Sequence, residues 1–272
     1  MRQFSKITSL VSLGVALGAG LALSGSVAQA AECAPPRVVV VTALAIKYCV
    51  DPAFDSLIQE QVRKIRQDVK AQRQAQKLIV YASTPISSRG GGHTPTNLDI
   101  SASVKAGIEK EYGGGVWVLD PGRYQLPALA GKAPGGSEYM VMWTAVLAGE
   151  DGTGEDFDMV HFTGPGNMRA FFGCGTSDVV ACIDRYVTAR AATDERFRRE
   201  VADQADGRRR FIRFYALRAS STYSLGAHDE WNIFVAINHR RPVGEQIAMS
   251  FDGRPLSPGE METAVSPGYE FR

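Results

Sequence analysis

A polar segment over residues 220–230 combines the side chains that nucleophilic or acid–base chemistry needs, and it ends in Asp229 and Glu230. A carboxylate there can act as a nucleophile, as a general acid or base, or as an acceptor for sugar hydroxyls. We expect a helix to begin near Glu230, where the positive end of the helix dipole keeps a carboxylate ionised. An ionised carboxylate suits a nucleophile or an electrostatic stabiliser better than an acid, so Glu230 is the first catalytic candidate, with Asp120 or Asp229 as a second carboxylate that transfers protons. The alternative is that Asp229 and Glu230 simply cap the helix.

Three further loops, over residues 83–93, 120–123 and 164–167, each follow a predicted strand. The first is rich in glycine and leads into a helix, whose free N–H groups favour an anion or a polar ligand. The alternative is a surface loop that needs glycine only for its backbone. Together the four loops supply the candidate ligand-binding residues, which are Thr84, Gly90, Gly91, Gly92, Asn97, Gly164, Asn167, Ser221, His228 and Asp229.

The sequence lacks the motifs of several common enzyme classes and of EF-hand calcium sites. The glycine-rich loop is neither a dinucleotide-binding fingerprint nor a Walker loop, and no G-x-S-x-G nucleophile elbow occurs. The acidic turn over residues 149–158 lacks the ligand spacing of an EF-hand, so we interpret it as a solvated turn. We therefore expect no metal and no cofactor. Three aromatic residues could stack on a base or a sugar, although core packing is the commoner role, and these are Tyr139, Trp143 and Tyr223.

The four cysteines predict two disulfides rather than a zinc site. Cys33 and Cys49 are sixteen residues apart, and Cys174 and Cys182 are eight apart. These spacings match no zinc pattern, and the four histidines do not cluster with the cysteines. Three pairings are possible, and we favour the two local ones because each closes a short loop.

The first thirty residues have the pattern of a cleavable signal peptide. Basic Arg2 and Lys6 precede an uncharged apolar run over residues 10–23, and small residues end in Ala28-Gln29-Ala30. Fourteen apolar residues are fewer than the roughly 20 that span a bilayer. The sequence therefore predicts a periplasmic or secreted protein with no membrane insertion after cleavage.

Hydrophobic periodicity divides the remaining chain into an N-terminal segment over residues 31–76 and an α/β domain over residues 77–272. The segment contains a possible strand at residues 37–46. An amphipathic helix at 52–76 follows, with apolar residues at Ile58, Val62, Ile65 and Val69.

The α/β domain begins with a strand–helix–strand unit. It consists of a strand at 77–84, a helix that opens with a capping box at Thr96–Asp99 and stops at Gly113–Gly115, and a strand at 116–119. Further along we expect helices at 137–148, within 177–205 and at 230–238, and strands at 159–163, 211–217 and 247–251.

This alternation predicts a three-layer α/β sandwich with a mainly parallel, Rossmann-like sheet. In such sheets ligands bind beyond the carboxyl ends of the strands, so the four loops should meet at one cleft. The formal net charge of +1 gives no general reason to expect nucleic acid as a partner. The arginines over 196–213 alternate with acidic residues, which is typical of a solvated helical face.

Two short stretches resemble the nucleoside 2-deoxyribosyltransferase-like Rossmannoid superfamily. Its members open with an apolar strand that ends in a G-P-[IL] turn, and Ser83-Thr84-Pro85-Ile86 occupies that place here. They also carry a D-x-G-T-x-x-E loop, whose glutamate attacks an anomeric carbon and matches Glu230 in GAHDEWNIFVA. Thr84 replaces the usual glycine, and the D-x-G-T element is reduced to residues 225–228. The resemblance spans residues 77–240 and implies an N-glycosidase or glycosyltransferase-like hydrolase that acts on a nucleotide- or sugar-like molecule. The alternative is a non-catalytic binding or interaction domain.

Overall fold

The computed structural model describes residues 33–271. The predicted signal peptide at residues 1–30 therefore lies outside the described residues. Within the described chain, no helix combines the length and apolar character needed to cross a membrane. The described residues group into one compact unit, so the N-terminal segment packs with the α/β domain.

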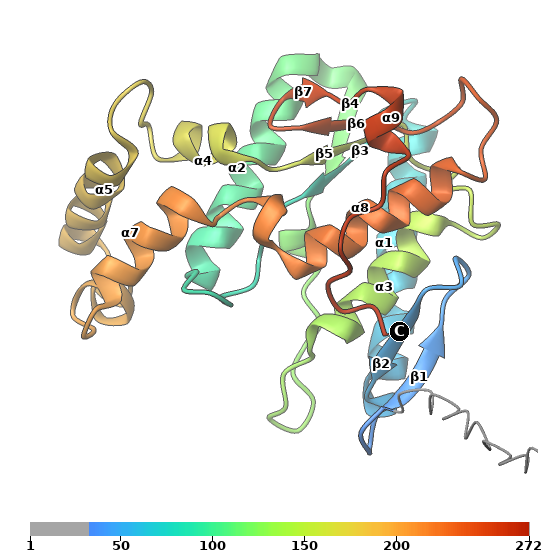
Figure 1. Ribbon diagram of the computed structural model, residues 1–272, viewed down its shortest axis with the longest axis horizontal. Helices are drawn as coiled ribbons and strands as arrows, with labels where there is room; N and C mark the ends of the chain where they lie inside the picture. The colour runs from blue at the N-terminus through green and yellow to red at the C-terminus, as the bar shows by residue number, and fades with distance from the viewer. Residues whose placement is uncertain (1–32, 272) are drawn as a thin grey trace, which may run out of the picture. The chain divides into compact units, whose positions relative to one another are not determined.

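A five-stranded sheet in the order β4-β3-β5-β6-β7 forms the middle layer (Figure 1). The first four strands are parallel, and only the short β7 is antiparallel to its neighbour. The strands are β3 (Leu78–Ser83), β4 (Val116–Leu119), β5 (Met159–Phe162), β6 (Ala248–Phe251) and β7 (Arg254–Pro255).

Helices cover both faces of the sheet, which confirms the three-layer α/β sandwich. The face of the sheet on which the Tyr81 side chain lies packs against α1 (Asp55–Gln74), α3 (Gly136–Ala148) and α8 (Leu225–Asn238). The face on which Val80 lies is covered by α2 (Thr94–Tyr112), and the hydrophobic core of this side extends away from the sheet through α4 (Pro165–Phe171), α5 (Val179–Thr193) and α7 (Gly207–Leu217) (Figure 1). Neighbouring residues of β3 thus serve different cores, because successive side chains of a strand point to opposite faces. Two short helices complete the fold, α6 (Glu195–Phe197) and α9 (Pro258–Met261).

The segment Phe211–Leu217 is helical, so the strand predicted there is wrong. Its aromatic and β-branched residues favour a strand locally. However, Phe211, Phe214 and Tyr215 are three and four residues apart and are all buried in one core, which is the spacing of a helix face. Tertiary packing therefore decides the conformation of α7.

The N-terminal segment folds as a hairpin instead of one strand. β1 (Val38–Val41) pairs antiparallel with β2 (Lys47–Val50), and the intervening turn places Ala45 at φ 63°. The structure contains both predicted local disulfides, Cys33–Cys49 in this hairpin and Cys174–Cys182 between α4 and α5.

Candidate functional site

Glu230 lies in the second turn of α8 rather than at its N-terminus. The helix begins at Leu225, and the Ser224 hydroxyl accepts the capping hydrogen bond from the Ala227 N–H. The helix thus begins five residues before Glu230, and the alternative that Asp229 and Glu230 cap it is wrong. The helix dipole acts within the first turn, so it does not decide the charge of Glu230.

Two hydroxyl groups of β3 hold the Glu230 carboxyl. Tyr81 donates its phenolic proton to one oxygen at 2.6 Å, and Ser83 donates to the other at 2.5 Å. The Glu230 side chain is buried, and burial raises its pKa to about 7. The two hydrogen bonds oppose this rise because they favour the ionised form, while the charge of Asp229 adds to it. Near neutral pH this carboxyl can therefore exchange a proton without a large cost.

Glu230 lines a cavity of about 420 Å³, which is within the size range of small-molecule sites. The walls come from the loops after β3 and β4, the start of α3, the end of α7 and the start of α8. Two of the four predicted loops, 83–93 and 120–123, therefore meet there with the 220–230 segment. That third segment follows α7 and not a strand.

Of the predicted ligand-binding residues, Thr84 lines this cavity. Its hydroxyl shares a hydrogen bond of 2.8 Å with Thr163, which ties the ends of β3 and β5 together. Ser221 lies behind the cavity wall, where its N–H donates to the Thr163 carbonyl and its hydroxyl to the Ser83 carbonyl. It positions the wall and does not line the cavity.

Asp120 lies outside this cavity. Its carboxylate accepts hydrogen bonds from the Ser101 hydroxyl and the Gly122 N–H, and it caps the short helical turn Pro121–Arg123. It borders a different surface depression, beside Lys105. Asp120 is therefore not placed to exchange protons with a ligand next to Glu230.

The triple glycine and Asn97 shape the first loop from outside the cavity. Gly91 has φ 112°, and a side chain on Gly92 would come within 3.0 Å of Asn97 and Phe214. The Asn97 amide donates to the backbone carbonyls of Ile86 and Ser87. These residues act through the loop conformation, because Arg89 and Thr94 line the cavity while Gly90, Gly91 and Gly92 do not.

Gly164 and Asn167 are engaged elsewhere, although their loop does follow β5. The Asp252 carboxylate accepts from the Gly166 and Asn167 N–H groups at 2.8 and 2.9 Å, and so occupies the N-terminus of α4. The Asn167 side chain accepts a hydrogen bond from the Gly164 N–H. This loop therefore does not reach the Glu230 cavity.

Asp229 and His228 hold the C-terminal segment Thr263–Phe271, which we call the strap. The two Asp229 carboxylate oxygens accept from the N–H groups of Gly268 and Tyr269, each at 2.7 Å. The two ring nitrogens of His228 lie 3.0 and 2.8 Å from the carbonyl oxygens of Ser266 and Thr222. Burial raises the pKa of Asp229, and the strap N–H groups counteract that rise.

Several residues at or beside the cavity were not among the predicted site residues. Tyr81 and Ser83 hold Glu230 without lining the cavity, and their spacing of two on β3 is the signal that both point to one face of the strand. Arg89, Arg218 and Tyr269 line the cavity itself. The aromatic residues that could stack on a ligand do line it, namely Tyr139, Trp143 and Tyr223.

Among the described residues, no group of three or more His, Cys, Asp or Glu side chains could hold a metal ion. Comparisons with family models, curated proteins and solved structures gave no match to this chain. The functional argument therefore depends on the geometry of the cavity.

Proposed function

We propose that this protein binds a nucleotide- or sugar-like small molecule in the Glu230 cavity and cleaves or transfers its N-glycosidic bond. The observation that carries the proposal is a buried carboxyl group that lines the cavity, is fixed by two hydroxyl donors and has a pKa of about 7. Perturbed carboxyl groups in clefts are frequent at catalytic sites.

In the proposed reaction the ionised Glu230 is the nucleophile. A carboxylate oxygen forms a bond to the anomeric carbon, the carbon–nitrogen bond breaks, and its electron pair leaves on the nitrogen. Because Glu230 is the only carboxylate among the cavity-lining residues, the departing nitrogen takes its proton from water. A second water then attacks the anomeric carbon and gives its proton to the hydroxide left by the first step. The bond between the carbon and the Glu230 oxygen breaks, which regenerates the Glu230 carboxylate and releases the sugar.

Tyr81 and Ser83 prepare this carboxylate in two ways. Their hydrogen bonds fix both oxygens, so the carboxyl group approaches a ligand in one orientation. They also hold the pKa of Glu230 below the value that burial alone would give. The aromatic wall supplies flat surfaces suited to a base or a sugar ring.

The decisive substitution is Glu230→Gln, which keeps the size of the side chain and removes its charge. With a panel of nucleosides and nucleotides, we expect turnover to fall about 10³-fold or more while affinity changes little, because a nucleophile acts in the chemical step. The matched control is Glu262→Gln, an exposed glutamate outside the cavity lining, which should keep wild-type turnover. Equal turnover in Glu230→Gln and wild type would exclude Glu230 as the nucleophile.

The second candidate function is a non-catalytic binding domain. The observation that favours it is the position of Asp120, which leaves the cavity without the second carboxylate expected for proton transfer. If the wild type binds members of the panel and hydrolyses none, this second function replaces the first.

We also propose that the protein works in the periplasm or outside the cell. The two disulfides support this location, because such bonds persist in oxidising compartments. Cell fractionation with N-terminal sequencing tests the proposal. We expect the mature chain to begin at Ala31 and to be found outside the cytoplasm.

A further inference from the structure

The Glu230 cavity has an uneven distribution of charge. Among its lining residues the charged side chains are Arg89, Arg218 and Glu230. We propose that Arg89 and Arg218 bind a phosphate group of the ligand, so that the substrate is a phosphate ester of the sugar-like molecule. This inference rests on the proposed function for the chemistry at Glu230, but the phosphate site is a separate claim about binding.

Neither arginine is neutralised by an ion pair in the described part of the chain. Other arginines of the same region do have carboxylate partners: Arg190 pairs with Asp99, and Arg208 pairs with Asp184. The contact found for the Arg89 guanidinium is with the ring of Tyr269, whose centroid lies 5.9 Å away. Two unpaired guanidinium groups at one cavity provide charge-assisted donors for an anion.

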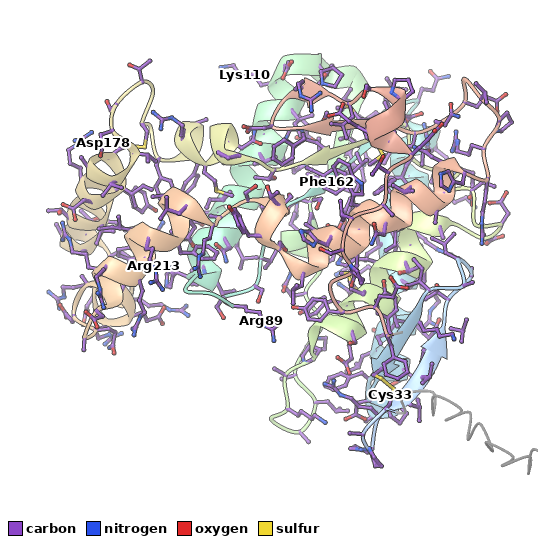
Figure 2. All side chains as sticks on the ribbon, in the orientation of Figure 1. Cys33, Arg89, Lys110, Phe162, Asp178 and Arg213 are labelled. Carbon is purple, nitrogen blue, oxygen red and sulfur yellow. A yellow bond between two sulfur atoms is a disulfide. The ribbon has the colours of Figure 1, made fainter. Side chains whose placement is uncertain are left out.

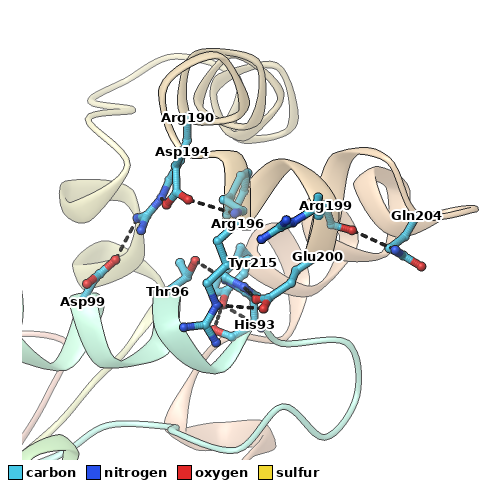
Figure 3. Close-up of polar contacts among 11 residues, drawn as sticks. His93, Thr96, Asp99, Arg190, Asp194, Arg196, Arg199, Glu200, Gln204 and Tyr215 are labelled. Atoms are coloured by element: carbon cyan, nitrogen blue, oxygen red, sulfur yellow. Dashed lines mark hydrogen bonds and ion pairs between the residues drawn. The ribbon is translucent and has the colours of Figure 1, made fainter.

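The fold brings the two arginines to neighbouring walls. Arg89 lies on the loop after β3 (Figure 2), and the next two residues lie close to Phe214 of α7, one turn before Arg218, which directly follows that helix. The end of this loop is fixed to α7 and to the preceding helical turn. His93 contacts the Tyr215 hydroxyl through its backbone and Glu200 through its ring at 2.9 Å (Figure 3).

Three helix N-termini at this cavity add to the positive character of its walls, while the C-terminal end of α7 beside Arg218 has the opposite sign. The first residues of α3 and α8, Gly136 and Leu225, also line the cavity, and so does Thr94 at the start of α2. Helix N-termini present free N–H groups and a partial positive charge. The single acid, Glu230, is partly protonated near pH 7 because its pKa is raised.

A phosphate ester fits this arrangement better than a carboxylate. It carries up to two negative charges and three terminal oxygens, enough to engage two guanidinium groups on different elements. A carboxylate has two oxygens, and one guanidinium group can donate a hydrogen bond to each of them. A neutral ligand would leave both arginines without a partner.

The test measures binding of ribose and ribose 5-phosphate to the disulfide-bonded protein by titration calorimetry, with inorganic phosphate as a third probe. The variants are Arg89→Gln/Arg218→Gln and Arg218→Gln alone, with folding checked by circular dichroism. Arg213→Gln is the control, because Arg213 is an exposed arginine of α7 outside this cavity (Figure 2).

In the wild type and the control we expect ribose 5-phosphate to bind at least about tenfold more tightly than ribose, with a preference that weakens as salt rises. The double variant should lose most of this preference, and the single variant part of it. Equal binding of the two sugars by the wild type, no binding of either, or a preference that survives the double substitution would each overturn the phosphate site.

The two proposals fail in different ways. If Glu230→Gln keeps the phosphate preference but also keeps turnover, the phosphate site stands and the role of Glu230 is wrong. If Glu230→Gln loses turnover while the wild type does not distinguish ribose from ribose 5-phosphate, the phosphate site is wrong and the glycosidic chemistry stands.

Discussion

Burial raises the pKa of Glu230 and its two hydrogen bonds lower it, so the chemistry of this residue depends on their balance. As a nucleophile it must be ionised, so kcat/KM should rise with pH through about 7 and level off above that value. The Ser83 hydroxyl lowers the pKa of Glu230. In Ser83→Ala the pH profile should therefore move to higher pH. A control, Ser87→Ala, removes a hydroxyl that lines the cavity and donates no bond to Glu230. A profile unchanged by Ser83→Ala would contradict this coupling.

The raised pKa of Glu230 also leads to a prediction about the stability of the protein, which can be tested without a substrate. Glu230 titrates near 7 in the folded protein and near 4.5 in a solvated chain, so between these values the folded state binds the extra proton. The free energy of unfolding should fall as pH rises from 4.5 to 7, by on the order of 3 kcal/mol from this group. Urea unfolding of wild type and Glu230→Gln at pH 5 and pH 8 isolates the effect. The wild type should lose stability relative to the variant, and a constant difference would mean that the Glu230 pKa is near normal.

At the scale of single residues, the sequence predicted the candidate acid but not its surroundings. Glu230 is recognisable because it follows a polar segment and precedes an apolar helix. Tyr81 and Ser83 lie 149 and 147 residues away in the chain, and nothing local shows that the strand and the helix meet. The same reason applies in part to Asp120, because its hydrogen bond from Ser101 of α2 joins two elements, whereas its cap on Gly122 is local.

At the scale of elements, the strap is attached to α8 by side-chain hydrogen bonds and to β2 by the backbone hydrogen bond from Phe271 to Lys47. Asp229 accepts two strap N–H groups, and the Asn232 side chain both donates to and accepts from the backbone of Val265. Tyr269 on this strap lines the cavity and contacts Arg89. The strap therefore links the C-terminus to the ligand site.

Asp229→Ala should loosen the strap around Gly268 and Tyr269, because their N–H groups lose their acceptor, at a cost of about 1–3 kcal/mol. We expect faster amide hydrogen exchange at these two residues and weaker ligand binding, with the sheet unaffected. Gly268→Ala offers an independent test, since an added Cβ would lie 1.9 Å from the Leu225 carbonyl oxygen. Exchange rates equal to wild type in both variants would show that other contacts hold the strap.

The elements themselves follow from the sequence to different degrees. β4 (Val116–Leu119) and α1 (Asp55–Gln74) agree closely with prediction because their patterns are continuous, β4 following Gly115 and α1 following Pro52. The predicted capping box at Thr96 is wrong, since α2 begins at Thr94 and Thr96 is buried within the helix. Such a boundary depends on where His93 is held, and its hydrogen bonds with Tyr215 and Glu200 are tertiary contacts.

At the scale of the molecule, two hydrophobic cores share one sheet, and this arrangement predicts a single unfolding transition. All three tryptophans, Trp117, Trp143 and Trp231, belong to or pack against the core beneath α1, α3 and α8. Ile183 of α5 is fully buried in the opposite core. Ile183→Ala should destabilise the protein by about 2–5 kcal/mol through the cavity it leaves. Because the two cores use alternate residues of the same strands, tryptophan fluorescence and far-ultraviolet circular dichroism should report the same lowered midpoint in urea.

The matched control is Ile65→Ala, a fully buried isoleucine of α1 in the tryptophan-bearing core, which should also move both signals together. If Ile183→Ala shifts the dichroism signal and leaves the fluorescence midpoint unchanged, the two layers of helices unfold independently and the cavity between them is a boundary between two folding units.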